Sequence, residues 1–322
     1  MKNLLLVLCL VILLGCSVHL VSFKQVYEYE SQKIEYNPEK AHAEIVQRVN
    51  APKGLYAEYT NHHYYIIDDG RITVLDDINN HKTKKEISYN WRQYYNDSLE
   101  CTYKVICGNG IMEHNNKITF MLTLEQRYFS TPEYYTYYND RKIYYKYPLF
   151  SVDSDGTNFC MSDITVDIAS AERIDGFYYD NDEATLWVIL YRSYDTRELH
   201  RYKYNSMQSH FVRDDYSPKI KYDFGQIYLT KNKITDVFYC DNRRYDWISS
   251  RLTVFTDYNA QEYQTVWITS LGLSDKPLAV FCDEDSVWLY VTDGTSDSYP
   301  GGHYEFLKIN CLGDVYPLKE SL

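Results

Sequence analysis

Three short segments in the second half of the chain share one pattern, and this repeat constrains the fold more strongly than any other feature. Each has three apolar, aromatic or cysteine residues followed by an aspartate: Phe177–Asp180, Phe238–Asp241 and Val280–Asp283. Two further strand-like stretches follow each segment: Thr185–Tyr191 and Glu198–Tyr204, Ser250–Phe255 and Glu262–Thr269, and Ser286–Val291 and Tyr304–Ile309. Short runs of this kind, rich in apolar and aromatic residues, are typical of strands. The sequence therefore predicts repeated antiparallel meanders, each starting at one of these segments.

Meanders that recur every 40 to 50 residues or so are typical of β-propeller blades. A single blade cannot cover both of its faces, whereas blades in a ring cover one another and leave little edge. We predict an all-β fold: a β-propeller of about five to six blades with one short N-terminal helix. A β-sandwich, whose strands would also alternate, is the alternative. The five recognisable blades lie near 55–92, 102–165, 174–215, 234–271 and 278–318, and a sixth would lie in 17–53 or 213–233.

Local signals give the remaining elements. Asn37-Pro38-Glu39, followed by apolar residues at helical spacing, predicts a short helix over about 38–49. Asp68-Asp69-Gly70 between apolar runs predicts a hairpin turn. Gly108-Asn109-Gly110 predicts another turn, and the tail segment 314–318 is expected to add an outer strand.

Tyrosine is the compositional outlier, with 36 residues. Strands favour tyrosine, whose ring packs while its hydroxyl reaches water or a backbone partner. The hairpin 134–147 is especially rich in tyrosine. Exposed rings there would stack on sugars or form a protein interface. Packing between blades is the other interpretation, and we favour it.

The first fifteen residues have the layout of a signal peptide, with Lys2 followed by an uncharged apolar run from Leu4 to Gly15. That run is too short to span a hydrocarbon core, which takes about 20 residues. It ends in Leu13-Leu14-Gly15-Cys16, which resembles the lipobox of bacterial lipoproteins. The resemblance implies that Cys16 receives a thioether-linked diacylglycerol and that the peptide before it is removed. Acylation of the new amino terminus would then make membrane attachment stable.

Ser17 follows the cysteine, in place of the aspartate that retains such lipoproteins in the inner membrane of enteric-type bacteria. The resemblance therefore favours the outer membrane. Because apolar residues continue to Phe23, segment 4–23 as an uncleaved anchor is an alternative, and plain secretion is another. The expected organisation is a signal peptide over 1–15, a lipidated tether over 16–36 and a single β-propeller domain over 37–322.

Charge and cysteine content agree with an exported protein. The formal charge of −12, without basic clusters, argues against nucleic acid and against adsorption to anionic lipid. An even number of cysteines in an oxidising compartment permits three disulfides, although cysteine is also often buried as a thiol. The sequence leaves open whether disulfides or buried thiols are formed by Cys101, Cys107, Cys160, Cys240, Cys282 and Cys311.

The turn Asp153-Ser154-Asp155-Gly156-Thr157-Asn158 resembles the blade turn of the Tol-system β-propeller and its relatives, in which a strand ends in Asp-x-Asp-Gly-Ser/Thr-Asn. This resemblance implies the architecture and brings no catalytic residue with it. The spacing does not fit a calcium-binding EF-hand loop, because Ile164 stands where the glutamate ligand belongs. The turn also departs from the sialidase Asp-box, because Asn158 stands where tryptophan belongs.

The remaining candidates are weaker. His62 and His63 are expected in a surface turn, because neighbouring strand residues point to opposite faces and rarely share a metal. Loop 292–303 is a polar, glycine-rich insertion of the kind that carries function in propellers, but we favour its interpretation as a flexible hairpin tip. No phosphate-binding loop, dinucleotide fingerprint or nucleophile elbow occurs. We therefore assign no catalytic, cofactor or metal residue.

The function expected from these features is that of a lipid-anchored, non-enzymatic cell-envelope protein. Its propeller would act as a binding or scaffold module for a protein or glycan partner. The alternative is an envelope carbohydrate-active enzyme, of glycosidase or lyase type, with its site at the central opening. An enzyme would gather several ionisable side chains in one central pocket, whereas a binding module would present a tyrosine-lined face.

Overall fold

The computed structural model describes the chain from residue 42 to residue 317, with gaps. The ranges are 42–79, 82–98, 101–128, 143–162, 173–193, 196–206, 210–214, 226–230, 233–242, 247–255, 262–267, 271, 277–283, 286–292, 302–312 and 316–317. Within these ranges the fold is all-β, and Trp91–Gln93 form a 3-10 turn, η1. The predicted signal peptide, Cys16 and the tether lie outside the described residues. No helix in the described part is long and apolar enough to cross a membrane.

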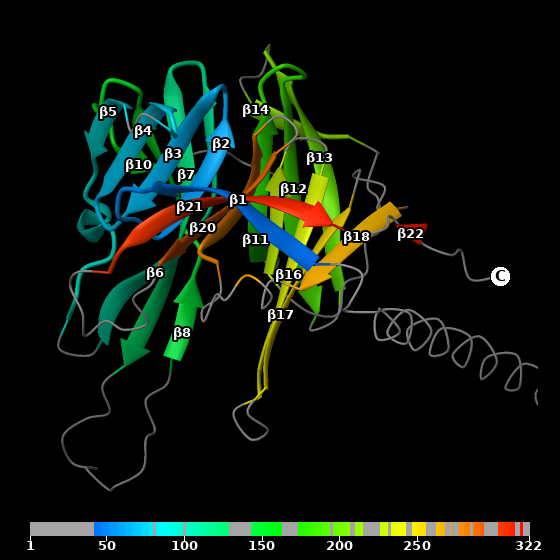
Figure 1. The fold of residues 1–322 in the computed structure, drawn as a ribbon. Helices are drawn as coiled ribbons and strands as arrows, with labels where there is room; N and C mark the ends of the chain where they lie inside the picture. Colours follow the sequence, from blue (N-terminus) through cyan, green and yellow to red (C-terminus); the bar gives the residue numbers. More distant parts are fainter. Residues whose placement is uncertain are drawn as a thin grey trace, which may run out of the picture.

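The strands form five antiparallel groups of four, which we call units I to V (Figure 1). Unit I has β2 (Tyr56–Thr60), β3 (His63–Asp68), β4 (Arg71–Asp77) and β5 (Lys82–Ser88). Unit II has β6 (Cys101–His114), β7 (Lys117–Tyr128), β9 (Leu149–Asp153) and β10 (Cys160–Met161), with β8 (Ile143–Lys146) beside β7. Unit III has β11 (Arg173–Asp180), β12 (Thr185–Ser193), β13 (Thr196–Asn205) and β14 (His210–Arg213).

Units IV and V complete the set. Unit IV has β15 (Gln226–Thr230), β16 (Lys233–Asn242), β17 (Trp247–Phe255) and β18 (Glu262–Trp267), and β22 (Tyr316–Pro317) pairs with β18. Unit V has β19 (Ala279–Asp283), β20 (Ser286–Thr292), β21 (Tyr304–Leu312) and, as its outer strand, β1 (His42–Asn50). One parallel pair, His42 with Trp267, joins β1 to β18, so units IV and V count as one nine-stranded sheet.

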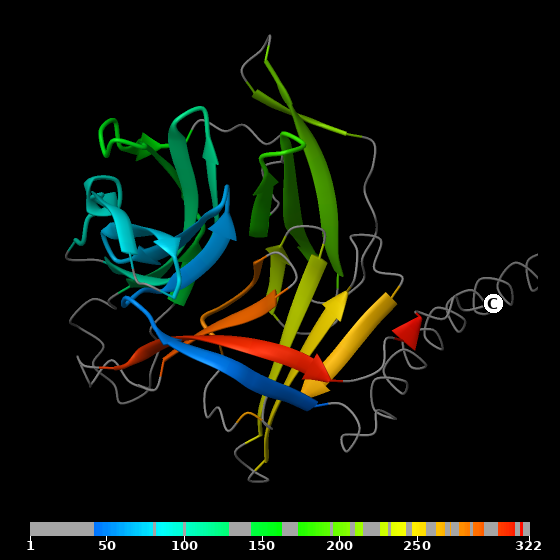
Figure 2. The same ribbon diagram turned by 45° about the horizontal axis from the view of Figure 1, so that its top comes forward.

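The first strands of the five units contact one another in a closed ring, in the order β2, β6, β11, β15, β19 and back to β2. Figure 2 shows the units arranged around this common centre. The fold is therefore all-β and propeller-like. The meanders predicted at Phe177–Asp180 and Val280–Asp283 start where expected, in β11 and β19. The segment Phe238–Asp241 does not start its meander, because it lies in β16, the second strand of unit IV.

The prediction of a short N-terminal helix is wrong. Residues 42–50 form strand β1, which pairs antiparallel with β21 from His42–Leu312 to Asn50–Glu305. Ala43 and Val49 are buried, whereas Val46 is 56% exposed. Long-range pairing with β21 supplies backbone partners for the whole segment, and this outweighs a local helix propensity that differs little between residues.

The expected turn at Gly108-Asn109-Gly110 is also wrong. Strand β6 runs through these residues with a register irregularity between Gly108 and Ile111, and it turns at Asn115 and Asn116, both with positive φ. Gly110 has φ +150°, and a Cβ placed on it would lie 2.8 Å from the carbonyl oxygen of Phe177 in β11. The glycine therefore permits a bulge and the close approach of two inner strands.

Two other turns are confirmed. Asp68, Asp69 and Gly70 connect β3 to β4, and Gly70 has φ +90°. In the turn after β9, the Asp153 amide donates to the Thr157 carbonyl and the Asn158 side chain donates to Asp153 at 2.6 Å. Its own hydrogen bonds hold this turn, together with two that Ser154 donates to the Asn116 carbonyl.

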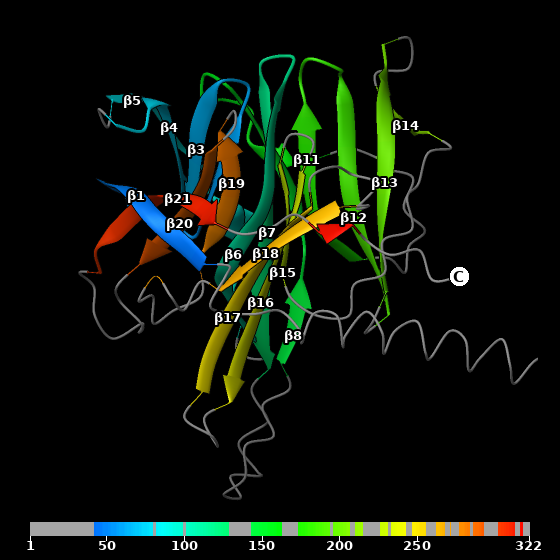
Figure 3. The same ribbon diagram turned by 45° about the vertical axis from the view of Figure 1, so that its right-hand side comes forward.

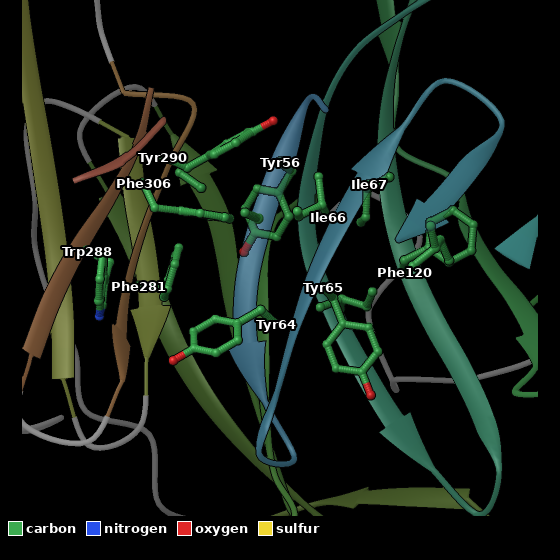
Figure 4. Packing of buried hydrophobic residues seen from close by; sticks show 14 of the residues in the cluster. Tyr56, Tyr64, Tyr65, Ile66, Ile67, Phe120, Phe281, Trp288, Tyr290 and Phe306 are labelled. Carbon is green, nitrogen blue, oxygen red and sulfur yellow. The ribbon is translucent and has the colours of Figure 1, made fainter. Parts of the chain in front are cut away.

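Tyrosine hydroxyls join neighbouring units. Tyr64 and Tyr65 are adjacent in β3 and point to opposite sides of the strand (Figure 4). The Tyr64 hydroxyl donates to Asp283 of unit V, and the Tyr65 hydroxyl donates to Glu113 of unit II. Unit I is thereby tied to both of its neighbours, which accounts for part of the tyrosine content.

Candidate functional site

The centre of the ring holds a buried carboxyl group. Glu58 lies in β2 with 1% of its surface exposed. Its Oε2 accepts hydrogen bonds from the Tyr56 hydroxyl at 2.7 Å and from the Ile111 amide of β6 at 3.1 Å. Its Oε1 has no hydrogen-bond partner among the described residues. Burial raises the pKa of Glu58 well above its usual value, which favours the neutral acid.

Side chains of the protein itself fill the space around Glu58. Tyr56, Tyr178 and Tyr228 come from three different inner strands, and each is at most 5% exposed. Burial raises the pKa of all three hydroxyls. The cavity between four inner strands has a volume of about 10 Å³, room for about one water molecule. Its lining residues are Tyr56, Asn109, Asp175, Gly176, Phe177, Tyr228 and Leu229.

A second feature lies on unit II, where β6, β7 and β8 extend side by side away from the ring (Figures 1 and 3). Gln126 of β7 pairs directly with Tyr103 of β6 on one side and with Tyr144 of β8 on the other. Paired residues share a face of a sheet, and so do residues two apart on one strand. Tyr103, Tyr128 and Tyr144 therefore lie on one face around Gln126. We call this set the tyrosine platform.

Gln126 is the buried centre of the platform and binds two of its tyrosine hydroxyls. It is 5% exposed, and its Nε2 donates to the hydroxyls of Tyr103 and Tyr128, both at 2.8 Å. The Tyr128 and Tyr144 rings meet edge to face, with centroids 5.6 Å apart and an interplanar angle of 87°. These two rings remain accessible, with exposed fractions of 40% and 49%. Hydrogen bonds fix the aromatic surface while its outer rings stay open to solvent.

The opposite face of the same strands is charged. Lys104 pairs with Glu125, and Glu125 pairs with Tyr145. The Arg127 Nε donates to Glu125. Tyr145 is 50% exposed, almost the same as its neighbour Tyr144, yet it lies among these charges. The extension therefore has an aromatic, mostly uncharged face and a charged face.

The structure separates the two interpretations of the tyrosine hairpin. Residues 134–142 lie outside the described part. Packing between units, the preferred interpretation, holds for Tyr147, which contacts the apolar cluster between units II and III. It is wrong for Tyr144 and Tyr145, which are exposed.

The other candidates stay apart from the platform. His62 has φ +60° in the turn before β3, as expected of a surface turn. His63 does not lie in this turn, because it is the first residue of β3. Residues 293–301 of the polar loop and Cys16 are not among the described residues. In the described ranges, no group of three or more His, Cys, Asp or Glu residues is arranged to hold a metal ion. Cys101, Cys107, Cys160, Cys282 and Cys311 are thiols rather than disulfides.

Sequence reasoning missed Gln126, Tyr103, Tyr128 and Glu58. Tyr103 and Tyr128 lie outside the tyrosine hairpin, and only the register of three strands brings them beside Tyr144. Glu58 follows Ala57 in a strand and has the pattern of a solvent-facing residue. The inner strand is buried on both faces instead.

Comparisons with known proteins give no family. No family model and no curated protein matches the chain. Solved structures give 73 matching chains. One is a family GH43 β-1,3-galactosidase with bound galactodeoxynojirimycin: identity 8%, coverage 82% of this chain and 94% of that one, TM-score 0.46. Another is a DUF4221 family member from Bacteroides vulgatus, which is 12% identical. The match covers 86% of this chain and 100% of that one, with a TM-score of 0.37. A third is Trypanosoma rangeli sialidase, which is 8% identical. The match covers 83% of this chain and 59% of that one, with a TM-score of 0.37. None of these likenesses bears on the activity of this chain.

Proposed function

We propose that this chain is a non-enzymatic binding module of the bacterial cell envelope. It is a five-bladed β-propeller, attached to the membrane through a lipid on Cys16, that engages its partner with the tyrosine platform. The observation that carries the proposal is the contrast between a filled ring centre and an accessible, hydrogen-bonded aromatic face on unit II.

The closed order of contacts among the five first strands supports a propeller over a sandwich. In a sandwich, two sheets would face each other instead. Units I to V are then the five blades. The two segments considered for a sixth blade supply β1 to unit V and β15 to unit IV. Strand β1 completes the last blade, which joins the beginning of the domain to its end.

The filled centre supports binding over catalysis. A carbohydrate-active enzyme with a central site needs a cleft that admits a sugar, and small-molecule sites typically measure about 300–1,000 Å³. Among the described residues, the cavity between β2, β6, β11 and β15 measures about 10 Å³. Glu58 is the central acid with a raised pKa, and its hydrogen bonds to Tyr56 and Ile111 join two inner strands. This arrangement supports a structural role for Glu58.

Site-specific photocrosslinking in intact cells tests the binding role. A benzophenone side chain at position 144 should give a covalent adduct, and the same group at position 145 should not. The two positions match in sequence context and exposure and differ in the face they occupy. Equal adduct yields at both positions would contradict the proposal. So would release of reducing sugar from envelope glycans by the purified protein, if Glu58→Gln abolished it.

Lipid labelling tests the anchor. Cells fed radioactive palmitate should label the wild-type protein, and Cys16→Ser should abolish the label and leave an unprocessed precursor. A Cys9→Ser variant is the control, because this second cysteine lies within the segment that would be removed. Unchanged processing of Cys16→Ser would refute the lipid anchor while leaving the platform proposal intact.

A further inference from the structure

We propose that the ligand of the tyrosine platform is a neutral carbohydrate chain. This inference rests on the proposed binding role and names the class of ligand. Three properties of the platform lead to it: the arrangement of its rings, the hydrogen-bonding group it presents, and its charge.

The rings suit the apolar face of a sugar. Tyr128 and Tyr144 stand at 87° to each other, so together they form a corner with one ring face and one ring edge. Aromatic side chains combine a flat apolar body with a polar end. The C–H groups on one side of a pyranose stack on such a ring face, while the sugar hydroxyls point to its rim.

The Tyr128 hydroxyl supplies the polar contact. It accepts a hydrogen bond from Gln126 Nε2 at 2.8 Å, and a hydroxyl that accepts one bond can still donate one. Gln126 is buried and also donates to Tyr103, which fixes the amide orientation. The Tyr128 O–H is thus held in place to donate to a sugar oxygen beside the ring corner.

Charge and area argue against the other ligand classes. The charged pair Glu125–Arg127 lies on the opposite face, and Lys146 is the one charged residue that the described parts of β6, β7 and β8 place on the platform face. Beside the platform, Asp97 accepts a hydrogen bond from the Tyr103 amide, and its charge is paired with Arg92. An acidic or basic ligand would find little counter-charge there. With about 150–250 Å² per aromatic side chain, the exposed fractions of Tyr128 and Tyr144 leave roughly 200 Å² of ring surface. A standard protein interface takes about 800 Å² per partner, so these two rings by themselves fit a sugar chain better than a protein.

Affinity gel electrophoresis of the purified mature protein tests the proposal. The gels contain a soluble neutral β-1,3-glucan, a soluble neutral galactan or anionic alginate. We expect retardation by at least one neutral polysaccharide and none by alginate. Tyr144→Ala and Tyr128→Ala should weaken binding at least tenfold, and Tyr128→Phe a few-fold, because it keeps the ring and loses the donor. Tyr144→Phe and the opposite-face control Tyr145→Ala should bind like wild type.

Three outcomes would overturn the inference: retardation by alginate alone, no retardation by either neutral polysaccharide, or an equal loss in Tyr145→Ala and Tyr144→Ala. Melting temperatures equal to that of wild type show that the variants fold, as expected for exposed positions. A protein adduct at position 144 without polysaccharide retardation would refute the carbohydrate ligand and leave the binding role standing. If neither adduct nor retardation occurs, both proposals fail.

Discussion

The Tyr56 hydroxyl donates to Glu58 at 2.7 Å in the centre of the ring, and both side chains are buried. Each has a pKa raised above its ordinary value, chiefly by burial. The folded state therefore favours the neutral forms of Tyr56 and Glu58. The hydrogen bond between them joins a phenol to a carboxylic acid. The centre of the propeller-like ring is thus sensitive to the loss of one proton.

Because the pKa of Glu58 is higher in the folded state, that state binds more protons than the unfolded chain above about pH 4.5. The free energy of unfolding should therefore fall as pH rises from that value toward the folded-state pKa. Glu58→Gln cannot ionise, so its stability relative to wild type should increase by up to about 1.4 kcal/mol per pH unit.

Urea unfolding of both proteins between pH 5 and 8 measures this difference. Partial burial lowers the pKa of His114, which adds its own pH dependence in this window. Both proteins share His114, so its effect cancels in the comparison. Parallel stability curves would show that Glu58 titrates normally.

Tyr64→Phe and Tyr65→Phe should each lower the free energy of unfolding by about 1–3 kcal/mol, because each leaves a carboxylate without its hydroxyl donor. The two hydroxyls reach different units, so the double variant should show the sum of the two effects within about 0.5 kcal/mol. Chemical denaturation of the wild type, the two single variants and the double variant gives the free energies for a double-mutant cycle. A double variant no less stable than either single one would mean that the two contacts act as one.

Gly110→Ala should destabilise the protein by about 2–4 kcal/mol, because it combines an unfavourable φ with a contact at 2.8 Å to Phe177. Gly70→Ala is the matched control. Gly70 also has positive φ, but its added Cβ would meet only the Tyr89 carbonyl, at 3.4 Å. We expect a cost of about 1–2 kcal/mol there, from strain alone. Equal changes in thermal stability would argue against close packing of β6 on β11.

A protein that begins at residue 51 lacks β1 and should melt at a lower temperature than the mature chain. It should also associate with increasing concentration, because β21 would become an exposed edge. A synthetic peptide of residues 42–50 should restore the melting temperature, and a peptide of the same composition in scrambled order should not. Equal melting temperatures with and without residues 42–50 would contradict the closing role of β1.

Local patterns predicted the strand meanders well, because alternation and Asp-Gly turns depend on neighbouring residues. The helix over 38–49 failed because β1 is specified by its pairing with Leu312 and other residues about 260 positions away. The tyrosine platform could not be predicted from the sequence for a related reason. Whether Tyr144 or Tyr145 shares a face with Gln126 depends on the register between β7 and β8, which no single strand encodes.

The position of β1 also has a mechanical consequence. Its first residue, His42, pairs with Leu312 at the end of β21, and β1 is the outer strand of unit V. Tension on the chain before His42 would therefore load the β1–β21 ladder first, from its His42 end. The ladder bonds would open one after another, and the other units would stay unloaded until β1 had peeled away. Resistance to pulling at the N-terminal side thus depends on the β1–β21 pair and on the one bridge from His42 to Trp267 of β18.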